Sequence, residues 1–202
     1  MKITRIKQQA RRAGRYSIFV DERYAFSLSD SALLDSKLVN GQELDEEQLR
    51  QFKQASVDDK LYNQTLSYVA LRPRSRWEIE FYLQRKSASP TLATTILNKL
   101  SNINLIDDEE FARAFVSDRR LLRPTSRRKI IAELRKKHVP EEAIETAVGN
   151  EPEAETGALR ATVERKRKQA KYRDDLKLMQ YLARQGYNYG DIKAALNNDP
   201  TD

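Results

Sequence analysis

The sequence of 202 residues contains no cysteine. Disulfides, thiolate metal sites and cysteine nucleophiles are therefore excluded, and the composition is typical of proteins in a reducing compartment. The first residues lack the apolar core of a signal peptide, and no run approaches the roughly 18 apolar residues that a membrane-spanning helix needs. We therefore expect a soluble, cytoplasmic protein with no membrane partner.

Residues that commonly carry catalysis are also scarce, since His138 is the single histidine. A histidine metal cluster is excluded, and a Ser-His-Asp triad would depend on this one residue. The consecutive acids at 107–110 point in different directions on a helix and are typical of a helix N-terminus. The sequence also lacks a glycine-rich phosphate loop. It therefore predicts a protein that is not an enzyme and has no metal or cofactor.

The charge that is present leans positive. The chain has 37 Lys and Arg against 30 Asp and Glu, a net charge of +7 and a pI near 9.5. A basic balance favours polyanionic partners such as nucleic acid or an acidic filament. The alternative is a solvated surface that happens to lean positive.

Two short runs in the chain are nearly the same. Leu71–Arg76 reads LRPRSR and Leu122–Arg127 reads LRPTSR, and a fainter third copy follows. Internal periods of roughly 20–50 residues are typical of small helical units that stack into an array. Such arrays commonly bind other polymers along a long surface.

Each copy predicts a helix with the same landmarks, followed by a second helix. The landmarks are the N-caps Ser75, Ser126 and Asp174, the apolar pairs Ile79/Leu83, Ile130/Leu134 and Leu178/Leu182, and the ends Ser87, His138 and Gly186. The second helices begin near Pro90, Pro140 and Tyr189. Because an apolar residue follows each predicted end, we expect Schellman-type closures there.

The first part of the chain differs from the repeats. Tyr16, Ile18 and Val20 alternate with other residues, as do Tyr24, Phe26 and Leu28, and Asp21–Arg23 between them predicts a hairpin loop. Residues near Ile3 and Ile6 supply a candidate third strand. Further on, we expect Gly41 to end a short helical segment, Asp45 to cap the next helix, and Asp58 or Asp59 to begin another that stops before Pro73.

Cations at the predicted helix starts are unusual, because a positive charge there costs up to roughly 0.3–1 kcal/mol. Backbone amides and guanidinium groups would together form an anion-binding surface, although nearby acids such as those at 107–110 are alternative partners. The candidate binding residues are Arg72, Arg74, Arg76, Arg123, Arg127, Arg128 and Lys129. A secondary basic track, either a solvated helix face or an extension of this surface, comprises Arg165, Lys166, Arg167, Lys168, Lys171 and Arg173.

Four runs together resemble the RecX family, which regulates the bacterial RecA recombinase, and the resemblance extends from Ile3 to about Leu196. They are YSIFVDERYAFSLS, LRPRSRWEIEFYLQRK, LIDDEEFARAFVSDR and KLMQYLARQGYNYGDIKAAL. The resemblance implies a curved array of three-helix units that binds the RecA filament in its groove and limits ATP hydrolysis and strand exchange during recombination, DNA repair and the SOS response. Some members also bind DNA directly, and the family supplies no catalytic residue.

The sequence thus predicts a mainly α-helical fold, with three tandem three-helix repeats in an elongated curved array after a small N-terminal β-hairpin or sheet. The expected boundaries are 1–57 for the N-terminal element, 58–106 and 107–150 for the first two repeats, and 151–202 for the third repeat with its tail. The expected function is regulation of the RecA filament by a monomer. The alternative is a helical-repeat module that binds single- or double-stranded DNA without a recombinase.

Overall fold

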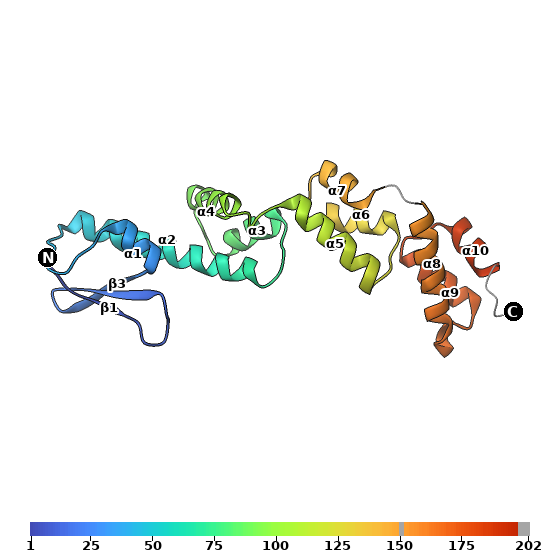
Figure 1. The fold of residues 1–202 in the computed structure, drawn as a ribbon, viewed down its shortest axis with the longest axis horizontal. Helices are drawn as coiled ribbons and strands as arrows, with labels where there is room; N and C mark the ends of the chain where they lie inside the picture. The colour runs from blue at the N-terminus through green and yellow to red at the C-terminus, as the bar shows by residue number, and fades with distance from the viewer. Residues whose placement is uncertain (150–151, 198–202) are drawn as a thin grey trace. The chain divides into compact units, whose positions relative to one another are not determined.

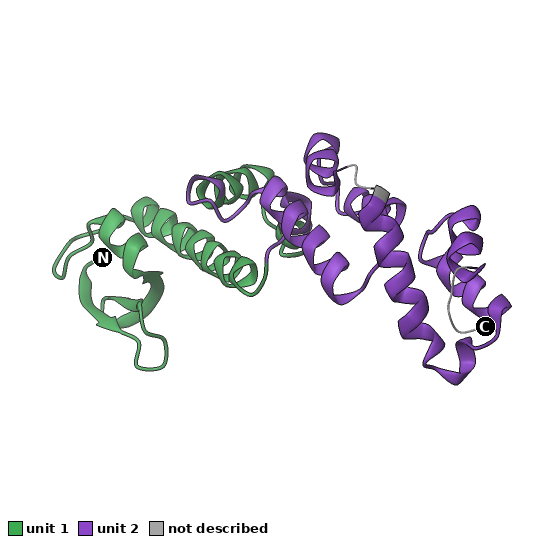
Figure 2. Cartoon of the chain, turned by 45° about the vertical axis from the view of Figure 1, so that its right-hand side comes forward, with its two compact units in different colours: residues 1–72, 82–100 green, residues 73–81, 101–202 purple. Residues whose placement is uncertain are grey.

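The computed structural model describes residues 1–149 and 152–197. It is mostly helical and has a small antiparallel sheet near the N-terminus (Figure 1). The chain divides into two compact units (Figure 2): unit 1 contains residues 1–72 and 82–100, and unit 2 contains residues 73–81 and 101–202. The predicted mainly helical fold with a small N-terminal sheet is confirmed, whereas the boundaries of the repeats stay predictions.

The sheet contains β1 (Ile3–Gln8), β2 (Arg15–Val20) and β3 (Arg23–Ser29) in that order. The turn between β2 and β3 has two residues, Asp21 and Glu22, with φ angles of 47° and 65°. Positive φ at both positions matches the right-handed twist of a hairpin. The predicted loop was one residue too long, because Arg23 pairs with Val20.

One face of the sheet forms the apolar core of unit 1. Ile3, Ile18, Val20, Phe26 and Leu28 are buried there. The register of β2 and β3 shifts between Ile18 and Phe19, so that Tyr24 pairs with Phe19 and is 59% exposed. The prediction that Tyr24 shares a face with Phe26 and Leu28 was therefore wrong, because one extra residue in a strand moves the side chains beyond it to the other face.

The helices of unit 1 begin with α1 (Asp30–Ser36) and α2 (Glu46–Ala70), and α4 (Pro90–Asn102) follows α3 (Arg76–Arg85), which crosses the unit boundary. Asp45 caps α2 as predicted, in a capping box with Gln48. The predicted stop before Pro73 is also confirmed. The helix start at Asp58 or Asp59 was wrong, because α2 is continuous there, and α1 ends at Lys37 rather than at Gly41.

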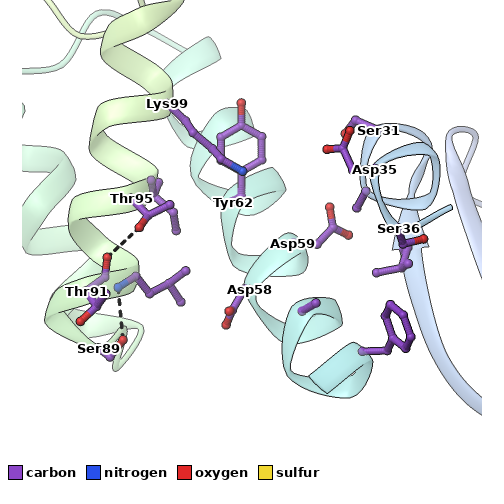
Figure 3. A pocket seen from close by; sticks show the side chains of 16 residues that line it. Ser31, Asp35, Ser36, Asp58, Asp59, Tyr62, Ser89, Thr91, Thr95 and Lys99 are labelled. Atoms are coloured by element: carbon purple, nitrogen blue, oxygen red, sulfur yellow. Dashed lines mark hydrogen bonds between the residues drawn. The ribbon is translucent and has the colours of Figure 1, made fainter. Parts of the chain in front are cut away.

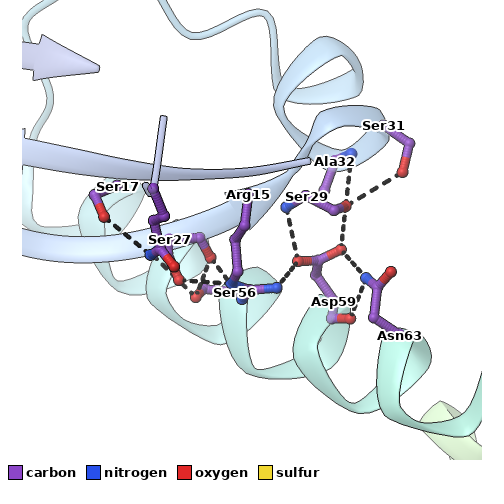
Figure 4. A network of polar contacts seen from close by, with 10 residues as sticks. Arg15, Ser17, Ser27, Ser29, Ser31, Ala32, Ser56, Asp59 and Asn63 are labelled. Carbon is purple, nitrogen blue, oxygen red and sulfur yellow. Dashed lines mark hydrogen bonds and ion pairs between the residues drawn. The ribbon is translucent and has the colours of Figure 1, made fainter. Parts of the chain in front are cut away.

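Asp59 instead joins α2 to the sheet through a buried polar network (Figure 4). Its Oδ2 lies 3.1 Å from Nη1 of Arg15 and accepts a hydrogen bond of 3.0 Å from the Ser29 amide. Asn63 donates to Oδ1 at 2.9 Å. The Arg15 side chain is 12% exposed and that of Asp59 7% exposed, so each charge has its compensating charge and hydrogen bonds inside the protein.

Unit 2 contains two similar groups of helices. The first comprises α5 (Asp108–Leu122), α6 (Arg127–Arg135) and α7 (Glu141–Val148), and the second comprises α8 (Pro152–Arg167), the 3₁₀ turn η1 (Ala170–Tyr172), α9 (Asp175–Arg184) and α10 (Tyr189–Asn197). Each group has its own apolar cluster. Leu134 and Ile144 are fully buried in the first cluster, and Leu178, Leu182 and Ile192 are fully buried in the second.

The predicted helix ends are confirmed in all three copies. Ser87, His138 and Gly186 have φ angles of 57°, 53° and 89°. The amide that follows each of them bonds to the carbonyl five residues earlier, from Ala88 to Leu83, from Val139 to Leu134 and from Tyr187 to Leu182. This is the Schellman closure. The predicted N-caps are confirmed as well, since Ser75, Ser126 and Asp174 each accept a bond from the amide three residues on.

Tyr187, the apolar residue of the third closure, is 5% exposed. Its hydroxyl has no hydrogen-bond partner among the described residues. The Thr162 hydroxyl lies near it and donates to the carbonyl of Ala158 at 2.7 Å. Burial raises the pKa of Tyr187 to about 12, because an apolar environment disfavours the phenolate.

Replacing Tyr187 by Phe should leave the free energy of unfolding unchanged or raise it by up to about 1 kcal/mol, because an unpaired buried hydroxyl stabilises nothing. Urea unfolding followed by circular dichroism measures this change. A loss of more than about 1 kcal/mol would mean that the hydroxyl has a partner in solution.

Replacing Asp59 by Ala should lower the free energy of unfolding by about 3–5 kcal/mol, because it leaves the buried Arg15 without its counter-charge. Asp58→Ala is the matched control, since within the described part of the chain the Asp58 carboxylate accepts a hydrogen bond only from the nearby Gln54. The control should change stability by about 0.5 kcal/mol or less. Equal effects of the two substitutions would show that the network is not stabilising.

Candidate partner-binding surface

Most of the predicted basic residues belong to unit 2 and lie around the starts of α3 and α6. Each of these helices begins at a fully buried serine, Ser75 or Ser126. A serine N-cap is usually at the surface, so burial indicates that the helix start packs against another part of the chain. In both copies that part is the end of the corresponding helix in the next repeat.

At the first junction, the start of α3 meets the end of α6. The Ser75 hydroxyl donates to the carbonyl of Lys137 at 2.9 Å. The Lys137 ammonium in turn lies 2.9 Å from Oε1 of Glu78, and Trp77 stacks on His138 with ring centroids 4.7 Å apart. A hydrogen bond, an ion pair and a ring contact thus join the two helices.

At the second junction, the start of α6 meets the end of α9 in the same way. The Ser126 amide donates to the carbonyl of Gln185 at 3.3 Å, and Lys129 Nζ donates to Oε1 of Gln185 at 2.9 Å and to the carbonyl of Arg184 at 3.3 Å. Lys129 occupies the position that Glu78 has in the first junction, and Gln185 that of Lys137. The two junctions thus use side chains at equivalent positions, but the Glu–Lys ion pair of the first is replaced by a Lys–Gln hydrogen bond in the second.

The contact at Gly186 is especially close. A Cβ atom on this residue would lie 2.4 Å from the Ser126 hydroxyl oxygen and 3.1 Å from Cβ of Lys129. The positive φ therefore favours glycine at Gly186, and the close approach of α6 leaves no room for a side chain there. At the first junction the corresponding residue, His138, uses its side chain to stack on Trp77.

Carboxylates from the next repeat cap the first amides of both helices. The Arg76 amide donates to Oδ1 of Asp108 at 2.8 Å, and the Arg127 amide donates to Oε1 of Glu155 at 3.1 Å. Burial raises the pKa of Asp108, while the bond from the Arg76 amide opposes this shift. The backbone amides of Arg76 and Arg127 are therefore not open to an external anion, because each already donates to a carboxylate of the chain. For Arg76 that carboxylate is Asp108, one of the acids at 107–110 that were the alternative partners.

Several predicted basic side chains also make internal contacts. Nε of Arg76 lies 3.1 Å from Oε1 of Glu80, and Nε of Arg127 donates to the carbonyl of Gly149 at 2.9 Å. Lys129 belongs to the second junction. These three residues therefore help to hold the chain together, and their role in binding a partner stays a prediction.

Two of the remaining candidates, Arg123 and Arg128, differ from these three residues in their surroundings. Arg123 and Arg128 are exposed, and their guanidinium groups make no hydrogen bond or ion pair with residues 1–149 or 152–197. Arg72, in unit 1, is exposed, and Arg74 is half-buried. The side chains of Arg123 and Arg128 flank the start of α6 and carry uncompensated positive charge.

Several side chains of the secondary basic track also contact other residues of the chain. Arg167 pairs with Asp175 at 2.5 Å and donates to the carbonyl of Arg173 at 2.9 Å. Lys166 Nζ lies 4.6 Å from the ring centroid of Tyr181, and Lys171 Nζ lies 5.6 Å from that of Tyr172. These contacts hold the connection between α8 and α9. Arg165, Lys168 and Arg173 are exposed.

A cavity of about 570 Å³, which the sequence did not predict, lies in unit 1 between α1, α2 and α4 (Figure 3). Its apolar lining includes Leu28, Phe52 and Ile96, and its polar lining includes Asp35 and Asp58. The contributing residues are far apart in the sequence and follow no common motif. Its three acidic groups, Asp35, Asp58 and Asp59, distinguish it from the basic surface of unit 2.

Among the described helices, none has the length and apolar character required to cross a bilayer. The longest, α2, carries charged residues along its length.

Comparisons with known proteins agree with the repeat organisation. Residues 1–45 match the family described as Regulatory protein RecX N-terminal domain, and residues 107–148 match RecX, second three-helix domain. A regulatory protein RecX of Lactobacillus johnsonii is 34% identical over 146 residues, which cover 72% of this chain and 54% of that protein. One from Listeria monocytogenes is 32% identical over 200 residues, which cover 96% of this chain and 74% of that protein.

Solved structures are similar as well. A crystal structure of regulatory protein RecX superimposes with a TM-score of 0.74 and 28% identity, covering 98% of this chain and 99% of that one. The structure of RecX from Lactobacillus salivarius gives a TM-score of 0.58 at 22% identity, covering 69% of this chain and 94% of that one, and shows a shared fold.

The second junction can be tested at Gly186. Gly186→Ala should lower the free energy of unfolding by about 1–3 kcal/mol, because the added methyl group meets Ser126 and the backbone is left-handed. Gly157→Ala is the matched control: Gly157 lies within α8 with no atom within 4 Å of the added carbon, so the change should stabilise by up to about 1 kcal/mol. Thermal unfolding of both variants measures the difference, and stabilisation by both would contradict close packing at Gly186.

Proposed function

The chain belongs to the RecX family of regulatory proteins, and on this premise we propose that it binds the RecA nucleoprotein filament and inhibits its ATPase and strand-exchange activities without catalysing a reaction. The observation that carries the proposal is the pair of exposed arginines at the start of α6. Arg123 and Arg128 have no counter-charge among the described residues. A charge that the fold does not use is available to a partner.

The junctions explain how such residues could act together. Ser126 and Lys129 fix the start of α6 against α9, so Arg123 and Arg128 project from a part of the chain with defined geometry. Several weak contacts from one preorganised chain add through effective concentration. Arg72 and Arg74 would provide equivalent contacts from the preceding copy, and the acceptors would be acidic side chains or DNA phosphates along the filament.

Inhibition would follow from binding across subunits of the filament. ATP hydrolysis and strand exchange require the subunits to move, and a ligand that binds one arrangement better than another shifts the population toward it. A chain that contacts successive subunits would favour a single arrangement. This mechanism requires no catalytic residue in the regulator.

The alternative is a module that binds DNA without a recombinase, which the net charge of +7 favours. A filament regulator should bind RecA-coated DNA more tightly than bare DNA, whereas a DNA-binding module should not. Titration of the fluorescently labelled protein onto bare DNA and onto RecA-coated DNA, at one fixed salt concentration, separates them. Tighter binding to coated DNA supports the filament, and equal or tighter binding to bare DNA supports the alternative.

Charge reversal of Arg123 and Arg128 to Glu should raise the concentration needed for half-inhibition of the DNA-dependent ATPase about tenfold, equal to about 1.4 kcal/mol. Helicity should be unchanged, because neither guanidinium makes a hydrogen bond or ion pair with residues 1–149 or 152–197. Reversal of Arg72, Arg74 and Arg76 should also weaken inhibition, and part of that effect would reflect the lost contact of Arg76 with Glu80.

The matched control reverses Arg160 and Lys193, which are exposed cations of unit 2 on α8 and α10. It changes the net charge by the same amount and should shift half-inhibition by less than about twofold. Equal effects of the two double variants would mean that Arg123 and Arg128 contribute to inhibition only through the net charge of the protein. Unchanged inhibition would remove them from the interface.

A further inference from the structure

A second basic surface lies in unit 1, where the loop between β1 and β2 faces α2. Two clefts of about 320 and 400 Å³ are present there, and both are lined by Arg12, Arg15 and Lys60. We call them together the basic cleft. Its other lining residues are Gln9, Ala13, Gly14, Tyr24, Ser27, Ser29, Ser56, Val57, Asn63, Gln64 and Ser67.

The basic cleft carries positive charge that the fold does not neutralise. Asp59 compensates Arg15, but the side chains of Arg12 and Lys60 are exposed and make no hydrogen bond or ion pair with the described residues. No Asp or Glu is among the residues that line either cleft. Two cations without a counter-charge among the described residues, both lining a concave, polar surface, form a suitable site for a phosphate group.

The wall of the cleft is held in place from behind. Arg15 donates to the Ser27 hydroxyl at 3.0 Å and to Asp59 at 3.1 Å, while the Ser56 hydroxyl donates to the Ser27 carbonyl at 2.6 Å (Figure 4). These bonds connect the sheet to α2 beneath the cleft. Buried polar contacts therefore hold together the sheet and α2, the two parts of the chain that border the cleft.

An aromatic ring stands at one end of the cleft. Tyr24 lines the smaller cleft and is 59% exposed. Its ring contacts Phe19 edge-on, with centroids 6.2 Å apart, and the guanidinium of Arg5 lies 4.3 Å from the Phe19 centroid. The strand bulge that moves Tyr24 out of the core thus places an exposed ring beside the cations. A ring beside basic side chains is the arrangement that binds single-stranded nucleic acid.

We propose that the basic cleft binds single-stranded nucleic acid, with Arg12 and Lys60 on backbone phosphates and Tyr24 stacked on a base. A duplex presents phosphates but keeps its base faces covered, so it would use the cations without the ring. An acidic peptide would do the same. This site lies in unit 1 and is separate from Arg123 and Arg128, so it can be tested independently of the proposed function.

The cations are tested by Arg12→Gln together with Lys60→Gln, using a fluorescein-labelled oligothymidylate and the purified full chain. Loss of two phosphate contacts should reduce the slope of log affinity against log salt by about 1.4, at about 0.7 per contact for a single strand. The matched control is Arg11→Gln with Lys53→Gln, two exposed cations from the same loop and the same helix that line neither cleft. Equal changes in the two double variants would overturn the proposal.

The ring is tested by Tyr24→Leu against Tyr24→Phe. Leu removes the stacking surface and should weaken oligothymidylate binding between about fivefold and a hundredfold, whereas Phe should bind within about twofold of the parent chain. Neither substitution at Tyr24 should alter binding to duplex DNA of the same length or to polyglutamate. Equal binding by the Leu and Phe variants, or an equal loss on duplex, would assign the surface to a general polyanion site and overturn the proposal. Circular dichroism confirms folding in each case.

Discussion

The docking of one helix start onto the end of the corresponding helix in the next repeat is the constraint on which unit 2 depends. It buries Ser75 against Lys137 and Ser126 against Gln185 and Gly186. A serine is small enough for this approach and caps its own helix at the same time. The receiving helix must end in a left-handed residue, because only then does the chain turn away and leave the terminal carbonyls open to the incoming helix.

The same docking resolves the electrostatic difficulty of cations at a helix start. Asp108 and Glu155 come from the following repeat and accept bonds from the first amides of α3 and α6. These carboxylates offset the helix dipole and the neighbouring arginines together. Some of the cations at the starts of α3 and α6 therefore stabilise the fold. The candidates for contact with a partner are the basic side chains that take no part in the two junctions. In unit 1, Arg12 and Lys60 are among the cations whose side chains have no partner in the described part of the chain.

Much of the fold was predictable because local rules were sufficient. The N-caps, the apolar pairs and the Schellman ends depend on residues within one or two helical turns, and all three copies agree with prediction. The misplaced helix start at Asp58 or Asp59 shows where such rules fail. Aspartate is common at an N-cap, but Asp59 is held within a helix by Arg15, which lies far from it in the sequence. Tyr24 was assigned to the wrong face of the sheet, because the alternation of apolar and polar residues in a sequence does not show where a strand contains a bulge.

The sequence by itself determined which segments are helices and strands, where they end, that they repeat, and the family to which they belong, because these follow from periodicity and from short capping motifs. Tertiary structure alone decided which charges are available. A cation is compensated or exposed according to the carboxylates and carbonyls that folding brings near it, and those partners come from another repeat or from the other side of a sheet. Arg127 and Arg128 are neighbours in the sequence, yet Arg127 bonds to Gly149 and Arg128 extends into solvent.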